Sequence, residues 1–135
     1  MMERKLVPGL SAEVTHRVEK NFLASEIGSG MVNVFSTAMM IAFMEEAAVA
    51  AVQPYLEEGY TTVGAHLDIT HSAPTPLGME IRCQAVLKEV SPSGKKLTFD
   101  VSATDASGLI GGGKHWRVLV HKDSFESSAA KKLKP

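Results

Sequence analysis

Apolar and polar residues alternate along much of the chain, which is the pattern of β-strands with one buried face. The alternation is strictest between Met79 and Val90 and between Lys95 and Thr104. Short segments rich in serine, glycine, proline and aspartate separate the last three predicted strands, so we expect these strands to form an antiparallel meander. In all, five stretches are typical of strands: Ser11 to Glu19, Tyr60 to Thr70, Met79 to Val90, Lys95 to Thr104 and Leu109 to His121.

One long apolar helix is predicted between the first and second strands. From Ser36 to about Gln53 helix-forming residues follow one another almost without interruption, and between Ala38 and Val52 only Glu45 and Glu46 are not apolar. The opening serine is a suitable N-cap, and the proline that follows the segment cannot continue a helix interior. A helix with so little polar surface must be buried, so we expect the sheet to wrap around it.

These elements predict an α+β hotdog fold, an antiparallel sheet wrapped around one long central helix. Residues 1–135 are interpreted as a single domain.

The segment Ala24 to Gly30 shows neither the alternation of a strand nor the repeat of a helix, and it contains two glycines. We therefore expect a loop there, of the kind that often forms a lid beside a site. The lysine-rich end, about Ser124 to Pro135, is expected to be frayed. A free helix flank and an edge strand predict a homodimer or a larger assembly.

Composition excludes several classes of function. Hydrophobic residues make up 44% and charged residues 21%, as in ordinary globular proteins. The 14 basic residues include three lysines among the last five positions, so the rest of the chain is acidic and lacks the surface that nucleic-acid binding requires. No apolar stretch is long enough to cross a membrane and none follows the N-terminus as a signal sequence. With one cysteine, Cys83, and therefore no intrachain disulfide, we expect a cytoplasmic protein.

Common catalytic and metal-binding motifs are missing or incomplete. The segment GLIGGGKH at 108–115 resembles a phosphate-binding loop, but His115 stands where a Ser or Thr must hold Mg²⁺, and the following residues predict a strand in place of a helix. A bulge or a close backbone approach explains its glycines better. There is no GxSxG elbow, and the five histidines form no HExxH pair. We therefore expect neither a metal nor a resident cofactor.

Three polar residues are candidates for chemistry. On a helical wheel Thr37 shares a sector with apolar residues, Glu45 lies at its edge about 80° from Thr37, and Glu46 lies about 180° away. A carboxylate at the edge of an apolar sector pairs strongly with a nearby histidine or hydroxyl. His71 lies where the second predicted strand meets a proline-stiffened turn, a common place for function. Glu45 at a helix flank or subunit interface, and a structural His71, are the alternatives at this point.

Several segments, separated along the chain but in order, form a recognisable set. They are VFSTAMMIAFME at 34–45, PYLE at 54–57, THSAPTPLG at 70–78 and IGGGKHWR at 110–117. Together they resemble the fluoroacetyl-CoA thioesterase family of hotdog proteins, over a match from about Val34 to His121. The resemblance implies an acyl-CoA thioesterase that is a homodimer, with sites at the interface that draw residues from both chains.

The resemblance also implies roles for particular residues. A catalytic set of threonine, glutamate and histidine falls on Thr37, Glu45 and His71. A substrate-contacting glycine corresponds to Gly64, and an arginine near the CoA moiety corresponds to Arg117. In the implied reaction Glu45 and His71 activate Thr37 or a water, and amides at the helix N-terminus hold the oxyanion. Joint titration of the Glu and His pair predicts that activity rises between about pH 6 and 8.

The substrate implied is a short-chain acyl-CoA, split into a free acid and CoA, with CoA as part of the substrate. The fluoroacetate-specific member has bulky aromatic residues at the lid where this chain has Gly28 and Met31, so we do not expect discrimination for fluorine. Two alternatives are a hotdog dehydratase and a non-catalytic acyl-CoA or small-ligand binding protein. Dehydratases of this fold usually present an Asp and a His on the helix or its entry loop, and the helix here has neither.

Overall fold

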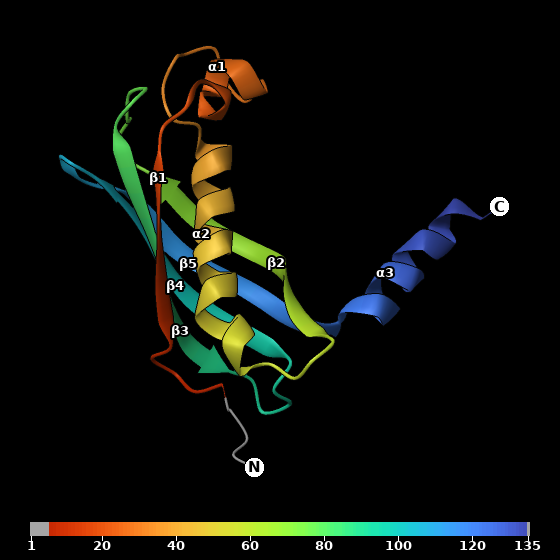
Figure 1. Cartoon of the computed structure of the whole chain (residues 1–135). Helices are drawn as coiled ribbons and strands as arrows, with labels where there is room; N and C mark the ends of the chain where they lie inside the picture. Colours follow the sequence, from red (N-terminus) through yellow and green to blue (C-terminus); the bar gives the residue numbers. More distant parts are fainter. Residues whose placement is uncertain (1–5, 135) are drawn as a thin grey trace.

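The computed structural model describes residues 6–134, in which five strands form one antiparallel sheet. The strands are β1 (Ser11–Arg17), β2 (Tyr60–His71), β3 (Glu80–Val90), β4 (Lys96–Asp105) and β5 (Gly108–His121), arranged in the order β1-β3-β4-β5-β2. The long helix α2 (Thr37–Val52) lies along one face of the sheet (Figure 1). This arrangement confirms the predicted α+β hotdog fold, including the β3-β4-β5 meander. No helix in the described part of the chain is both long and apolar enough to cross a membrane.

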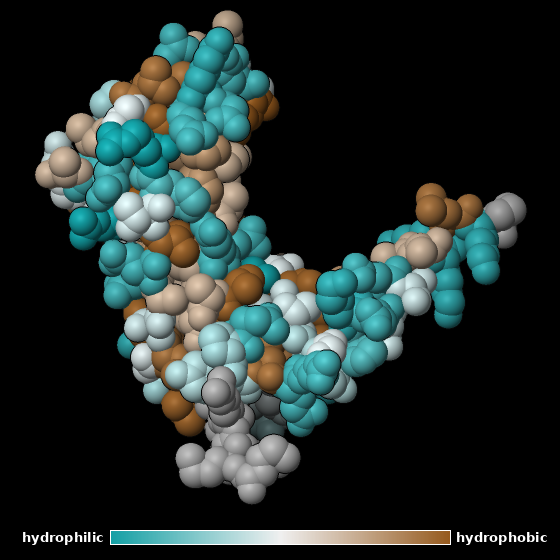
Figure 2. Space-filling view, viewed as in Figure 1, coloured by the Kyte–Doolittle hydropathy of each residue, from teal (hydrophilic) through white to brown (hydrophobic). Residues whose placement is uncertain are grey.

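The C-terminal segment, where a frayed tail was expected, is helical in the described residues. Helix α3 (Lys122–Ala130) follows β5 directly and continues as the 3-10 turn η3 (Lys131–Leu133). Its first turn is capped by His121, whose Nδ1 accepts the backbone N–H of Ser124, and Lys122 pairs with Glu126 one turn later. These contacts are local, and the apolar residues of the segment do not recur at a helical spacing that would have predicted the helix. The helix stands clear of the body and all its side chains are exposed (Figures 1 and 2).

The segment before α2 also contains more structure than predicted. A 3-10 turn η1 (Lys20–Phe22) leads into the one-turn helix α1 (Ala24–Ile27), where a loop was expected. Gly28 ends α1 in the left-handed conformation, with φ of 81°, and its N–H donates to the carbonyl of Ala24. A helix of four residues is too short for a hydrophobic period to reveal it. Only the rest of the predicted segment is irregular.

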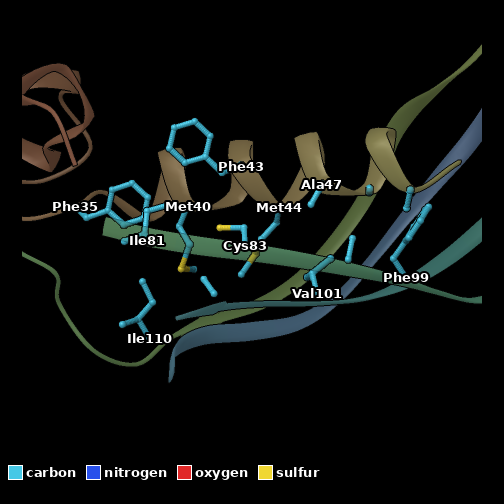
Figure 3. Close-up of a cluster of buried hydrophobic side chains, with 14 of the residues drawn as sticks. Phe35, Met40, Phe43, Met44, Ala47, Ile81, Cys83, Phe99, Val101 and Ile110 are labelled. Atoms are coloured by element: carbon cyan, nitrogen blue, oxygen red, sulfur yellow. The ribbon is translucent and has the colours of Figure 1, made fainter. Parts of the chain in front are cut away.

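Helix α2 begins and ends as its sequence predicts. The Ser36 side chain accepts the N–H of Met39 at 3.1 Å, and the 3-10 turn η2 (Gln53–Tyr55) takes over at the proline. Figure 3 shows that side chains of α2 such as Met40 and Met44 point into the core, where residues of β3 and β4 meet them. Each fully buried methionine or phenylalanine contributes roughly 2 kcal/mol to folding by leaving water. The burial of α2 therefore fixes its position over the sheet.

The helix covers the sheet unevenly, and this positions the polar residues of the interior. α2 packs chiefly on β3 and β1, while β2 forms the far edge of the sheet and pairs only with β5 among the described strands. Both His115 and Arg117 lie on β5 and are buried on the side of the sheet that faces α2. The region between α2 and β2 therefore holds a cluster of buried polar groups, among them Thr62, His115 and Arg117.

Candidate active site

Thr37 and His71 meet where α2 begins and β2 ends. Thr37 is the first residue of the helix, His71 is the last residue of the strand, and Oγ1 of Thr37 lies 2.7 Å from Nδ1 of His71. The ring of Phe35 packs edge-on against the imidazole at a centroid distance of 6.5 Å. A hydroxyl in hydrogen-bond contact with an imidazole is the arrangement in which the imidazole can remove the hydroxyl proton.

The imidazole of His71 is held toward its neutral form. Burial lowers its pKa, and the backbone of Ala73 only partly opposes this effect. If Nδ1 accepts the Thr37 hydroxyl, the single proton of the neutral ring is on Nε2. Nε2 is buried and has no hydrogen-bond partner within residues 6–134. An unpaired buried N–H is costly, so this atom needs either a closer approach by the Ala73 backbone, which already acts on the ring, or a group from outside the chain.

A cavity of about 380 Å³ opens beside this pair. Thr37 and His71 lie on its wall together with the segment that follows α1, from which Ser29, Gly30, Val32 and Val34 line the space. The lid segment predicted from the sequence therefore does border the candidate site. The volume is at the small end of the range for ligand pockets, and the valines make part of its wall apolar.

The N-terminus of α2 adds hydrogen-bond donors at the same place. Helix geometry leaves the amides of the first turn without intrahelical acceptors, and Ser36 satisfies only that of Met39. The amides of Thr37 and Ala38 are thus oriented as a helix N-terminus presents them to an anion. A developing oxyanion near Oγ1 of Thr37 can be stabilised there.

Glu45 lies in a second polar cluster, apart from Thr37 and His71. It comes eight positions after Thr37 in α2, about 12 Å along the helix axis. Its Oε2 accepts a hydrogen bond from Nη1 of Arg117 at 3.1 Å and lies 3.8 Å from Nε2 of His115. The chain by itself thus brings two of the three predicted catalytic residues together, and the third faces a different set of partners.

Gly64 and Arg117 both shape the surroundings of Glu45. They are paired across β2 and β5, and a Cβ atom at Gly64 would overlap Oε2 of Glu45. Arg117 is 5% exposed and donates from Nε to Oγ1 of Thr62 at 2.8 Å and from Nη2 to its carbonyl at 2.9 Å. Burial lowers the pKa of Arg117, while Glu45 raises it, and a guanidinium stays charged at neutral pH. The glycine makes room for the carboxylate and the arginine holds it.

Sequence reasoning missed two members of this cluster, His115 and Thr62. The prediction gave His115 no functional role, yet its imidazole is fully buried between Glu45 and Phe99. One signal was available: His115 and Arg117 are two positions apart on a predicted strand, so both side chains must point to the same face. Nothing in the sequence marks Thr62. In the described residues no group of three or more His, Cys, Asp or Glu side chains is arranged to hold a metal ion.

Comparisons with known proteins match nearly the whole chain. A family model described as fluoroacetyl-CoA-specific thioesterase matches residues 18–123. The fluoroacetyl-CoA thioesterase of Streptantibioticus cattleyicolor is 38% identical over 99 residues, which cover 73% of this chain and 70% of that protein. The solved structure of the fluoroacetyl-CoA thioesterase FlK superposes with a TM-score of 0.88 at 29% identity, over 95% of this chain and 98% of FlK. A thioesterase superfamily member from Thermus thermophilus superposes with a TM-score of 0.85 at 28% identity, over 97% of this chain and 95% of that one.

Proposed function

The chain belongs to the fluoroacetyl-CoA-specific thioesterase family, and we propose that it hydrolyses a short-chain acyl-CoA to the free acid and CoA. The observation that carries this proposal is the hydrogen bond between Thr37 and His71 at the wall of a small cavity and at the N-terminus of α2. The proposed nucleophile, base and oxyanion donors then all lie at the first turn of α2.

In the proposed reaction His71 removes a proton from the attacking oxygen, which is either Oγ1 of Thr37 or a water bound to it. A C–O bond forms at the thioester carbonyl, and the first-turn amides of α2 hold the oxyanion. The C–S bond then breaks, and the imidazolium of His71 returns the proton to the CoA sulfur. If Thr37 attacks, a water hydrolyses the acyl-threonine by the same steps. Mass spectrometry of the enzyme during turnover tells the two routes apart, because only attack by Thr37 leaves an acyl adduct.

The proposed enzyme is a homodimer in which a second copy brings Glu45 to Thr37 and His71. Within residues 6–134 the outer edge of β2 is unpaired, Nε2 of His71 is buried without a hydrogen-bond partner, and Glu45 lies apart from the pair. All three observations support this arrangement.

A subunit-mixing experiment tests the shared site. Thr37→Ala and Glu45→Gln are first shown to be inactive alone and are then mixed under conditions of subunit exchange. If each site takes residues from both chains, half of the dimers are mixed and one of their two sites is intact, so about a quarter of wild-type activity returns. If each site is built from one chain, every site carries a defect and no activity returns.

The acyl group is proposed to be small, apolar and not fluorinated. Val32 and Val34, which follow the predicted lid segment, line the cavity, and Met31 is 97% exposed. The cytoplasm is proposed as the location; the single cysteine, Cys83, is buried and free.

Release of thiol from a panel of acyl-CoAs tests the function as a whole. Free CoA from acetyl-CoA or propionyl-CoA is the expected result. An altered acyl chain on an intact thioester would indicate a dehydratase, and saturable binding without release would indicate a binding protein; either would contradict the proposal. A preference for fluoroacetyl-CoA over acetyl-CoA above about 10²-fold, roughly 3 kcal/mol in transition-state binding, would contradict the proposed acyl specificity.

A further inference from the structure

His115 is fully buried behind the Glu45 and Arg117 pair, with 0% of its surface exposed. Its two ring nitrogens have different partners. Nδ1 lies 3.0 Å from the carbonyl oxygen of His66, and Nε2 lies 3.0 Å from Nη1 of Arg117. Both ring nitrogens are therefore occupied by groups that the fold supplies.

The chemistry of these partners fixes the state of the ring. A carbonyl oxygen can only accept, so Nδ1 carries the proton, and a guanidinium can only donate, so Nε2 carries a lone pair. His115 is thus a neutral imidazole in a single tautomer. Burial, and to a lesser degree Arg117, lower its pKa, although the carbonyl of His66 and the charge of Glu45 oppose them. A proton on Nε2 would face the N–H of Arg117.

A β-bulge supplies the carbonyl that fixes the tautomer. The register of β2 against β5 shifts between Gly64 and His66, so Ala65 has no partner on β5. Bulges disrupt the regular ladder locally and re-aim the groups beside them. Here the backbone oxygen of His66 binds His115, while the His66 ring packs on Trp116 at a centroid distance of 4.8 Å.

The guanidinium of Arg117 has a partner for each of its edges. Nε and Nη2 donate to Thr62, and the two hydrogens of Nη1 are shared between Oε2 of Glu45 and Nε2 of His115. Because His115 accepts one of the Nη1 hydrogens, the other is directed at Glu45. The guanidinium is planar, so the bonds to Thr62 and His115 together hold its plane, and the carboxylate over Gly64 meets the remaining Nη1 hydrogen in that plane.

We propose that His115 is a positioning residue, which holds Arg117 and through it fixes the carboxylate of Glu45. The role rests on the proposed function, in which Glu45 takes part in thioester hydrolysis. Displacements of about 1 Å in a positioned group can cost as much as 10²-fold in rate. His115 should therefore affect turnover through the position of Glu45, although it does not contact the substrate.

Three substitutions separate the two hydrogen bonds of the ring. In His115→Gln the amide oxygen can take the place of Nε2 and accept from Arg117. In His115→Asn the amide N–H can take the place of Nδ1, but the side chain is too short to offer Arg117 an acceptor. His115→Phe keeps the ring and loses both hydrogen bonds. We expect kcat within about threefold of wild type for Gln, and about tenfold or more lower for Asn and Phe, with KM little changed. Equal losses in Gln and Asn, or full activity in Phe, would overturn the proposal.

A measurement that needs no substrate keeps this test separate from the proposed function. In ¹⁵N NMR of the full chain, His115 should show a protonated Nδ1 and an unprotonated Nε2, unchanged between pH 6 and 8. The Nη1 hydrogens of Arg117 should exchange slowly with water in the wild type and in His115→Gln, and rapidly in His115→Asn. Because this comparison does not use His115→Phe, it holds even if that variant does not fold. The opposite tautomer, or the same exchange in all forms, would overturn the role of His115. Failure of the wild type to release CoA with these NMR signatures present would overturn only the thioesterase proposal.

Discussion

The hydroxyl of Thr37 lies 2.7 Å from Nδ1 of His71, across the junction between the start of α2 and the end of β2. The two residues are 34 positions apart in the chain, and the packing of the helix on the sheet brings them together. The contact joins a hydroxyl to a base with a lowered pKa at a helix N-terminus. This combination makes the behaviour of each residue testable by itself.

Replacement of Thr37 should affect chemistry more than stability. Thr37→Ala removes the attacking or water-binding hydroxyl, so we expect kcat to fall by about 10² or more. Thr37→Ser keeps a hydroxyl and should retain more of the activity. Since Thr37 is exposed at the helix start, both variants should unfold within roughly 0.5 kcal/mol of the wild type. Equal activity of the Ala and Ser variants would show that the hydroxyl is not used.

Glu45 and Glu46 are adjacent and chemically identical, and they provide a matched comparison. Glu45 binds Arg117, whereas Glu46 binds Nε2 of His16 at 2.7 Å on the other side of the helix. Glu45→Gln should lower kcat by about 10² or more. Glu46→Gln should leave kcat unchanged and cost at most about 1 kcal/mol of stability, because the contact of Glu46 with His16 is partly exposed to solvent. Similar kcat losses in both, or a Glu45→Gln loss that tracks the thermal midpoint, would remove Glu45 from the site.

Gly64 should matter through the carboxylate above it. In Gly64→Ala the new methyl group overlaps Oε2 of Glu45, which is the end of a flexible side chain, so the protein should fold and Glu45 should move. We expect kcat to fall about tenfold. The double variant Gly64→Ala with Glu45→Gln should be no slower than Glu45→Gln alone, because both changes act on one interaction. Additive losses would instead indicate that Gly64 acts on the substrate directly.

The pH dependence of activity should shift to lower pH than the sequence suggested. The proposed base is the neutral form of His71, and burial lowers the pKa of this residue from the ordinary value of about 6.5. The neutral form therefore predominates already near pH 6.5. Values of kcat/KM should rise with pH through an inflection below about 6.5 and stay level between pH 7 and 8. An inflection above pH 7 would mean that a group other than His71, or a strongly coupled His71, controls the rate.

Much of the fold could be predicted because its signals are local. Strict alternation in β3 and β4 follows from one buried face, and Ser36 with the apolar residues behind it defines α2. Thr37 could be singled out by its sector on the helical wheel, and His71 by its place at the end of a strand. Helices α1 and α3 escaped prediction, since one has four residues and the other has no buried face and hence no period.

The cluster around Glu45 could not be derived from sequence patterns alone. Arg117 is 72 positions from Glu45, and their contact depends on the pairing of β5 with β2 and on where α2 lies over that pair. His115 is oriented by the carbonyl beside a bulge, a feature that leaves no periodic signal. The resemblance to a family pointed to Glu45, Gly64 and Arg117, and the structure adds His115 as the proposed positioning residue.

The most direct test of the account is the rate of CoA release by His71→Asn. The asparagine amide can take the place of Nδ1 and hydrogen-bond to Thr37, but it cannot accept a proton at neutral pH. We predict that kcat falls by about 10² or more and that the thermal midpoint stays close to that of the wild type. His121→Asn is the matched control, because asparagine is a good N-cap for α3 and kcat should not change. A His71→Asn variant that releases CoA at the wild-type rate would contradict the assignment of Thr37 and His71 as the centre of the reaction.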